Sequence, residues 1–132
     1  IGIGAGLADR LRELDMPAIA ISVSESPSLK DRFNRLRDEL FWNAREWFEG
    51  RDVKMPEDNT LIQELSGIRY KYLSSGKLKV ESKEEMKKRG QRSPDVADAF
   101  VLSFAESGSI ARGYSRAYNS NRKLSANRGW IV

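Results

Sequence analysis

The chain has 132 residues, a length typical of a single domain, and it contains no Cys and no His. This composition excludes disulfides, thiolate metal sites and catalysis by Ser-His or Cys-His pairs, so a bound metal needs oxygen ligands, which favours Mg²⁺, Mn²⁺ or Ca²⁺. The net charge of +4 comes from the end of the chain, because residues 1–106 hold 18 basic and 19 acidic residues and the rest holds five basic residues and no acidic one. No apolar run approaches the roughly 20 residues of a membrane span.

The first half of the chain predicts a strand, a glycine turn and helices. Residues 1–6 read as a strand end that runs into a glycine turn, and a helical period of leucines follows. The glycines match neither a dinucleotide-binding loop nor a Walker A loop. Residues 17–23 form an apolar run typical of a buried strand. Residues 29–48 predict the clearest helix, with an aromatic stripe for the core and a solvated opposite face that carries Arg32, Arg35, Asp38, Glu39, Arg45 and Glu46.

A short helix and a hairpin are predicted next. The helix starts at Met55-Pro56 and continues to about Leu65. Residues 68–73 and 77–81 then flank Ser74-Ser75-Gly76, a turn sequence typical of a β-hairpin. Basic residues alternate with apolar and aromatic ones along both strands, so one face is cationic. That face is either an ordinary solvated surface or a ribbon that contacts a nucleic-acid backbone.

A helix that is apolar nearly all round is predicted from Ser93 to Ala105, and such a helix is normally buried. Ser93 is a good N-cap and Pro94 fits the first helical position. Asp95 and Asp98 lie three residues apart, so the two carboxylates share one face of the helix.

The two aspartates allow structural and functional interpretations. Asp95 lies where a carboxylate stabilises any helix N-terminus. An ionised Asp98 among apolar neighbours must be paired, hydrogen-bonded or bound to a cation. One interpretation is therefore a buried ion pair with Arg89 or Arg92. The other is a metal ligand beside a basic loop that can hold phosphate.

Three blocks of the sequence, in this order and spacing, resemble the nuclease domain of tailed-phage terminase large subunits. They are residues 2–11 (GIGAGLADRL), the hairpin at 70–80, and residues 81–99 (ESKEEMKKRGQRSPDVADA). The similarity covers residues 1–106 and implies an α/β fold, a ribonuclease-H-like mixed sheet flanked by helices. Nucleases of that family use a cluster of acidic residues to bind Mg²⁺ or Mn²⁺, and they cut DNA.

The resemblance also implies roles for particular residues. The last acidic residue of the family falls on Asp98, and Asp95 matches a position that is His or Asp among relatives. The first strands and the other catalytic acids would precede Ile1, so the 132-residue chain by itself is expected to bind these ions weakly and to cut DNA poorly. Candidates for a third ligand within the chain are Asp9, Glu81, Glu84 and Glu85.

The predicted function is part of a metal-dependent DNA endonuclease that cuts concatemeric phage DNA during genome packaging in the host cytoplasm. The basic residues predicted to contact phosphate are Lys83, Lys87, Lys88, Arg89 and Arg92. Implied partners are double-stranded DNA, the terminase ATPase domain, the small terminase subunit and the portal, with no membrane. Two alternatives remain: a non-catalytic module that docks DNA or protein through the basic, flexible tail at 107–132, and a structural fragment whose aspartates are capped or ion-paired.

Overall fold

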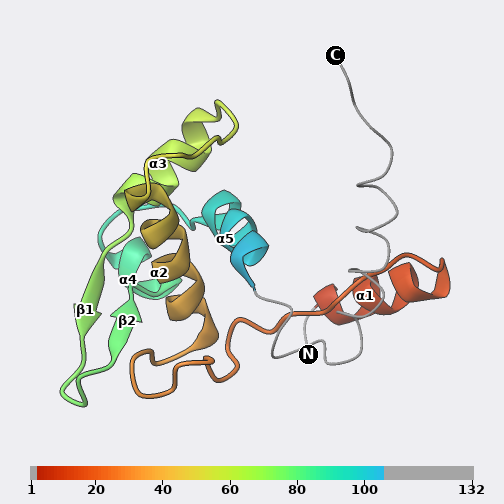
Figure 1. Cartoon of the computed structure of the whole chain (residues 1–132), viewed down its shortest axis with the longest axis horizontal. Coiled ribbons are helices and arrows are strands. Elements are labelled where there is room, and N and C mark those ends of the chain that lie inside the picture. The colour runs from red at the N-terminus through yellow and green to blue at the C-terminus, as the bar shows by residue number, and fades with distance from the viewer. Residues whose placement is uncertain (1–2, 106–132) are drawn as a thin grey trace.

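The computed structural model describes residues 3–105. Two strands and four short helices pack around one core, while a further helix, α1, lies apart from them (Figure 1). The elements in chain order are α1 (Ile3–Glu13), α2 (Leu36–Glu49), α3 (Asn59–Gly67), β1 (Tyr70–Tyr72), β2 (Leu78–Val80), α4 (Lys83–Lys88), α5 (Asp95–Val101) and the 3₁₀ helix η1 (Leu102–Phe104). The tail predicted at 107–132 lies outside the described residues.

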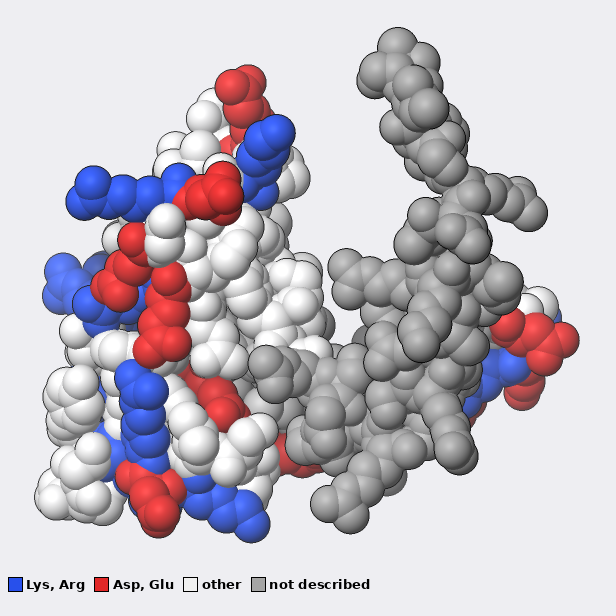
Figure 2. Space-filling view, viewed as in Figure 1, with Lys and Arg blue, Asp and Glu red and all other residues white. Residues whose placement is uncertain are grey.

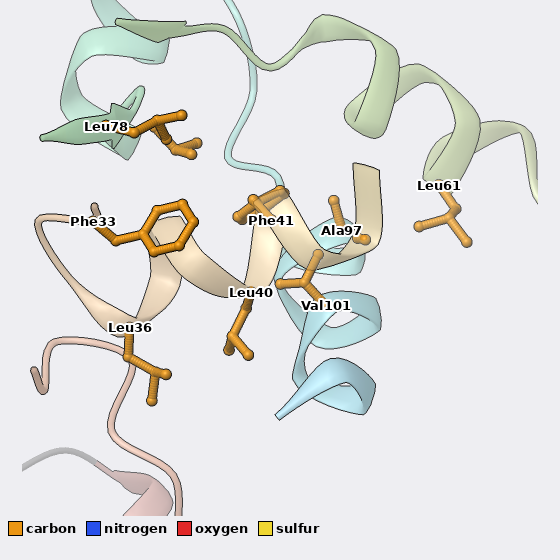
Figure 3. Packing of buried hydrophobic residues seen from close by; sticks show 10 residues of the cluster. Phe33, Leu36, Leu40, Phe41, Leu61, Leu78, Ala97 and Val101 are labelled. Atoms are coloured by element: carbon orange, nitrogen blue, oxygen red, sulfur yellow. The ribbon is translucent and has the colours of Figure 1, made fainter. Parts of the chain in front are cut away.

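The core is built on α2, which the aromatic stripe of the sequence predicted. Leu40 of α2 and Leu78 of β2 are each only 1% exposed, and Ala97 of α5 is fully buried. Figure 3 shows these side chains converging from α2, β2, α3 and α5 onto one apolar cluster. Burying one large aliphatic side chain contributes about 1.5–3 kcal/mol, so this cluster fixes α5 and the hairpin against α2.

Helix α2 begins later than predicted, at Leu36 instead of Leu29. Its start is set by Asp38, whose Oδ2 accepts a hydrogen bond of 2.8 Å from the backbone N–H of Arg35. The preceding residues form turns, and Phe33 makes a parallel bridge to Leu78 of β2. Because Phe33 is 1% exposed, it still occupies the core position that its spacing predicted.

Two strand predictions in the first 23 residues are wrong. Residues 3–13 form helix α1, and a side chain at Gly6 would meet nothing within 4 Å, so no tight glycine turn exists there. Residues 17–23 form no strand; instead the carbonyl of Val23 accepts a hydrogen bond of 3.0 Å from the N–H of Arg37 in the first turn of α2. A strand needs a partner for its backbone groups, and this segment meets the open N–H groups of a helix end instead.

The hairpin prediction is confirmed. Strands β1 and β2 are antiparallel, and Lys71 is paired with Lys79 at the centre of the register. Gly76 adopts a φ of +79° in the turn, a conformation that only glycine reaches at little cost. Helix α3 begins at Asn59, later than the predicted start at Met55-Pro56. Asp58 is its N-cap and accepts hydrogen bonds from the backbone N–H groups of Thr60 and Leu61.

Helix α5 is buried on one side only, in contrast to the prediction of a helix buried nearly all round. Ala97 and Val101 are buried, whereas Val96 is 38% exposed and Leu102, the first residue of η1, is 36% exposed. Within residues 3–105, α2 and α3 pack against the Ala97 side of α5. None of the helices described here has the length and hydropathy that a membrane crossing would require.

Candidate metal and phosphate site

The first turn of α5 is held by its neighbours rather than by its own cap. The predicted cap Ser93 makes no capping bond to the backbone, and its hydroxyl donates to Asp95 Oδ1 at 2.7 Å. The backbone N–H of Ala97 donates instead to Glu64 Oε2 of α3 at 2.8 Å. Because α3 and the core fix this turn, the positions of Asp95 and Asp98 are set by tertiary packing.

Asp98 is held between two cations from distant parts of the chain. Its Oδ1 accepts a hydrogen bond of 3.0 Å from Arg37 Nε of α2, and its Oδ2 lies 3.1 Å from Lys83 Nζ of α4. The Asp98 side chain is 21% exposed and the Arg37 side chain 14%. An arginine partner for Asp98 is thus present, but it is Arg37 rather than the expected Arg89 or Arg92.

Arg37 is the main site residue that the sequence did not single out. Its Nη1 donates to the carbonyl of Glu81 at 2.9 Å, and its guanidinium carbon lies 4.7 Å from the centre of the Phe41 ring. Its Nη2 is buried and has no hydrogen-bond partner among residues 3–105. Arg37 adjoins the apolar stripe of α2, but no local pattern indicates a partner 61 residues away.

Asp95 shares its cation with Asp98. Lys83 Nζ lies 2.8 Å from Asp95 Oδ1, so this ammonium bridges the two carboxylates. The hydrogen bond from Lys83 and a second one from Ser93 hold the pKa of the Asp95 carboxyl below its usual range. The same bond to Asp95, assisted by Asp98, raises the pKa of the Lys83 amine, so Lys83 is fully protonated at neutral pH.

The predicted phosphate contacts divide into two groups. Lys83, Lys87 and Arg92 line a pocket of about 460 Å³ beside the aspartates, together with Glu84, Gln91 and Ser93. Arg89 points elsewhere: it forms a bidentate pair with Glu81 at 2.8 and 2.7 Å and donates to the carbonyl of Gly67. Lys88 is exposed on α4 and does not line this pocket.

Of the four candidates for a third acid, Glu84 lines the pocket beside the aspartate pair, whereas the other three are engaged away from it. Asp9 pairs with Arg12 on α1, and Glu81 pairs with Arg89, which lowers the pKa of Glu81. Glu85 binds Lys71 and Lys79 of the hairpin, and these contacts, with the N–H of Ser82, lower its pKa to about 2. Within residues 3–105 no three carboxylates gather into a group that could hold a metal.

The charged surface near the site is mixed in sign. Figure 2 shows basic and acidic side chains next to one another over the hairpin side of the molecule, with a broad uncharged area beside them. The cationic face predicted for the hairpin is therefore partly neutralised, since Lys71 and Lys79 both contact Glu85. A separate apolar pocket of about 390 Å³ lies between α2 and the hairpin, and neither aspartate lines it.

The residues at this site supply some of the ligands that a divalent cation needs. Two carboxylates of α5 converge on one point that already holds a positive charge, and their oxygens are the ligand type that Mg²⁺ and Mn²⁺ prefer. Mg²⁺ is commonly bound through one or two carboxylates, with water and substrate phosphate as the remaining ligands. The basic pocket beside Lys83 offers a place for that phosphate.

The mixed α/β fold matches that of a ribonuclease-H-like nuclease domain. In particular, the chain is similar to the nuclease domain of the large terminase subunit of bacterial virus Sf6. A lysine-to-alanine mutant of that domain, solved with manganese, matches with a TM-score of 0.61 and 26% sequence identity, over 76% of this chain and 61% of that chain. The mutant solved with calcium matches with a TM-score of 0.60 and 25% identity.

The nuclease domain of that subunit without a stated mutation matches equally well, with a TM-score of 0.60, 25% identity and coverage of 76% of this chain and 60% of that chain. The chain thus spans less than two thirds of the domain that it matches. The predicted fold class and the predicted resemblance are confirmed by these structures. A scan against protein families and a search of curated proteins find no match.

Proposed function

We propose that this chain is part of a metal-dependent DNA endonuclease that cuts phage DNA during genome packaging. The observation that carries the proposal is the convergence of Asp95 and Asp98 on one cation beside a basic pocket, in a fold similar to a terminase nuclease domain. Two solved structures of a mutant of that domain, one with manganese and one with calcium, support a divalent cation at this site. Mg²⁺ or Mn²⁺ is the proposed cofactor.

In this proposal each residue has a distinct role. Asp98 and Asp95 hold the metal through carboxylate oxygens, and Arg37 fixes the orientation of the Asp98 carboxylate. Lys83, Lys87 and Arg92 contact DNA phosphates, Arg92 through paired hydrogen bonds and the lysines as point charges. When bound, the metal supplies an activated water and stabilises the leaving oxygen. Arg89, paired with Glu81, positions the loop between α4 and α5 rather than contacting phosphate.

The proposed setting follows the similarity to the terminase domain. Double-stranded DNA is the substrate, the terminase ATPase domain, the small terminase subunit and the portal are the partners, and the reaction takes place in the host cytoplasm. These assignments extend the identity of the solved relative, a nuclease domain of a large terminase subunit, to this chain.

A metal titration tests the proposal directly. Isothermal titration calorimetry with Mn²⁺ should detect one weak site in the 132-residue chain, since the two carboxylates leave most ligand positions to water. Asp98→Asn should weaken binding by about tenfold or more, because it removes a ligand charge. Asp9→Asn, on α1 and away from this site, is the matched control and should bind as the original chain does. Equal Mn²⁺ affinity in all three proteins would favour the structural alternative, in which the aspartates serve only as ion-pair partners.

A further inference from the structure

The two oxygens of the Asp98 carboxylate face different partners. Oδ1 accepts a hydrogen bond of 3.0 Å from Arg37 Nε of α2. Oδ2 faces the other aspartate, because Lys83 Nζ lies 3.1 Å from it and 2.8 Å from Asp95 Oδ1. A divalent cation that uses both carboxylates of α5 therefore meets Asp98 through Oδ2, while Oδ1 is directed at Arg37.

Arg37 is fixed in place by contacts that do not involve Asp98. Its Nη1 donates to the carbonyl of Glu81 at 2.9 Å, and its guanidinium carbon lies 4.7 Å from the centre of the Phe41 ring. The Arg37 side chain is only 14% exposed. Turning Asp98 Oδ1 towards a metal would break its contact with Nε and leave a largely buried guanidinium without its carboxylate. Because a buried charge that loses its partner is costly, Arg37 opposes that rotation.

The number of oxygens that Asp98 can offer bears on the choice of metal. Ca²⁺ is bound by about six to eight oxygens in a flexible geometry, to which a carboxylate can contribute both of its oxygens. Mg²⁺ demands a near-octahedral shell and is commonly bound through one or two carboxylates, with several waters retained. Mn²⁺ also favours octahedral oxygen sites. The narrow angle between the two oxygens of one carboxylate fits an octahedron poorly, so a carboxylate that offers a single oxygen suits Mg²⁺ and Mn²⁺ better than Ca²⁺.

We propose that Arg37 is a positioning residue that keeps Asp98 to one metal-facing oxygen and thereby makes the aspartate pair select Mg²⁺ or Mn²⁺ over Ca²⁺. This inference rests on the proposed function, because it assumes that Asp95 and Asp98 bind the metal. It assigns the selectivity of the site to a residue of α2 that lies 61 positions away in the sequence and acts through its hydrogen bond to a ligand.

The test compares Mn²⁺ and Ca²⁺ calorimetry on the 132-residue chain, on Arg37→Met and on Lys83→Met. The ratio of the two affinities is the readout, because a lost positive charge or a loosened fold affects both divalent ions alike. In Arg37→Met this ratio should shift towards Ca²⁺ by about threefold to tenfold, since Asp98 becomes free to offer both oxygens. Thermal unfolding of each variant checks that the fold is retained.

Lys83→Met is the matched control. It also removes one positive charge from the Asp98 carboxylate, but it leaves Arg37 on Oδ1, so its affinity ratio should equal that of the original chain. An unchanged ratio in Arg37→Met, or an equal shift in Lys83→Met, would overturn the selectivity role while the metal site stands.

A second measurement observes Arg37 in the original chain and does not depend on the stability of the variants. A hydrogen-bonded arginine Nε–H group is protected from exchange with water and gives its own NMR signal, and the Arg37 signal is the one missing from Arg37→Lys. It should remain protected at saturating Mg²⁺, because the metal takes Oδ2 alone. Loss of this protection would show that Asp98 leaves Arg37, which contradicts the inference. Equal Mn²⁺ affinity in the original chain and in Asp98→Asn would remove the proposed function, and the inference with it.

Discussion

Helices α2 and α5 each carry two carboxylates near their first turn, and the structure uses the two pairs in opposite ways. Asp38 and Glu39 of α2 are 3% and 6% exposed and accept hydrogen bonds from backbone N–H groups. Asp95 and Asp98 of α5 contact the side-chain cations of Lys83 and Arg37. A backbone donor cannot leave its carboxylate while the fold persists, whereas a lysine side chain can, so only the α5 pair is available for a ligand.

The α2 pair also corrects a sequence prediction. The face with Asp38 and Glu39 was expected to be solvated, yet Asp38 joins the start of α2 to β2 by accepting from the N–H groups of Arg35 and Val80, each at 2.8 Å. Burial raises the pKa of the Asp38 carboxyl, and those two N–H groups oppose the shift. Glu39 similarly accepts from the N–H groups of Ser28 and Leu29 and holds the loop before α2.

The largest expected effect is in the α2 pair. Asp38→Ala leaves two backbone N–H groups without partners, and each such group costs about 1–3 kcal/mol, so the free energy of unfolding should fall by about 3 kcal/mol. Urea unfolding followed by circular dichroism measures this. Asp9→Ala, which removes only the exposed pair with Arg12, is the control and should change stability by less than about 1 kcal/mol. A similar small loss in both variants would contradict the structural role of Asp38.

A smaller effect is expected in the α5 pair. Arg37→Met removes a partly buried partner of Asp98, and Asp98→Asn removes the opposite charge. Each should lower the free energy of unfolding by about 1–2 kcal/mol, less than a fully buried pair because Asp98 retains some contact with water and with Lys83. In a double-mutant cycle the two changes should couple by about 1 kcal/mol. Additive losses would show that the 3.0 Å contact contributes no energy of its own.

The smallest expected effect concerns Glu85, which contacts both a backbone N–H group and side-chain cations. It accepts from the backbone N–H of Ser82 and binds the exposed Lys71. Because its pKa is lowered to about 2, its ionised form favours the folded state, and this contribution is complete above its ordinary pKa of 4.5 and is lost as the pH falls towards 2. In Glu85→Gln that part of the acid dependence should disappear, while stability at pH 7 falls by less than about 1 kcal/mol after solvent screening. Unfolding curves at pH 7, 4 and 2.5 would reveal an unchanged pH dependence if Glu85 does not contribute.

Local sequence determined the elements whose signals lie within a few residues of one another. The turn sequence at Gly76 predicted the hairpin, and the apolar stripe around Leu40 predicted α2. The spacing of Asp95 and Asp98 predicted that their carboxylates share one helix face. These features depend on backbone conformation and helical period, which neighbouring residues fix by themselves. The resemblance carried by residues 81–99 added the fold class, which the solved relatives confirm.

Tertiary structure alone decided which charges meet. Arg37 reaches Asp98 across 61 residues, and Val80 donates to Asp38 across 42, because burial of Leu40, Leu78 and Ala97 brings their elements together. The same packing diverted Arg89 to Glu81 and left residues 17–23 without a strand partner. A charged side chain has no periodic signal for its partner, so the sequence predicts that a buried carboxylate needs a cation and the packed core determines which one it receives.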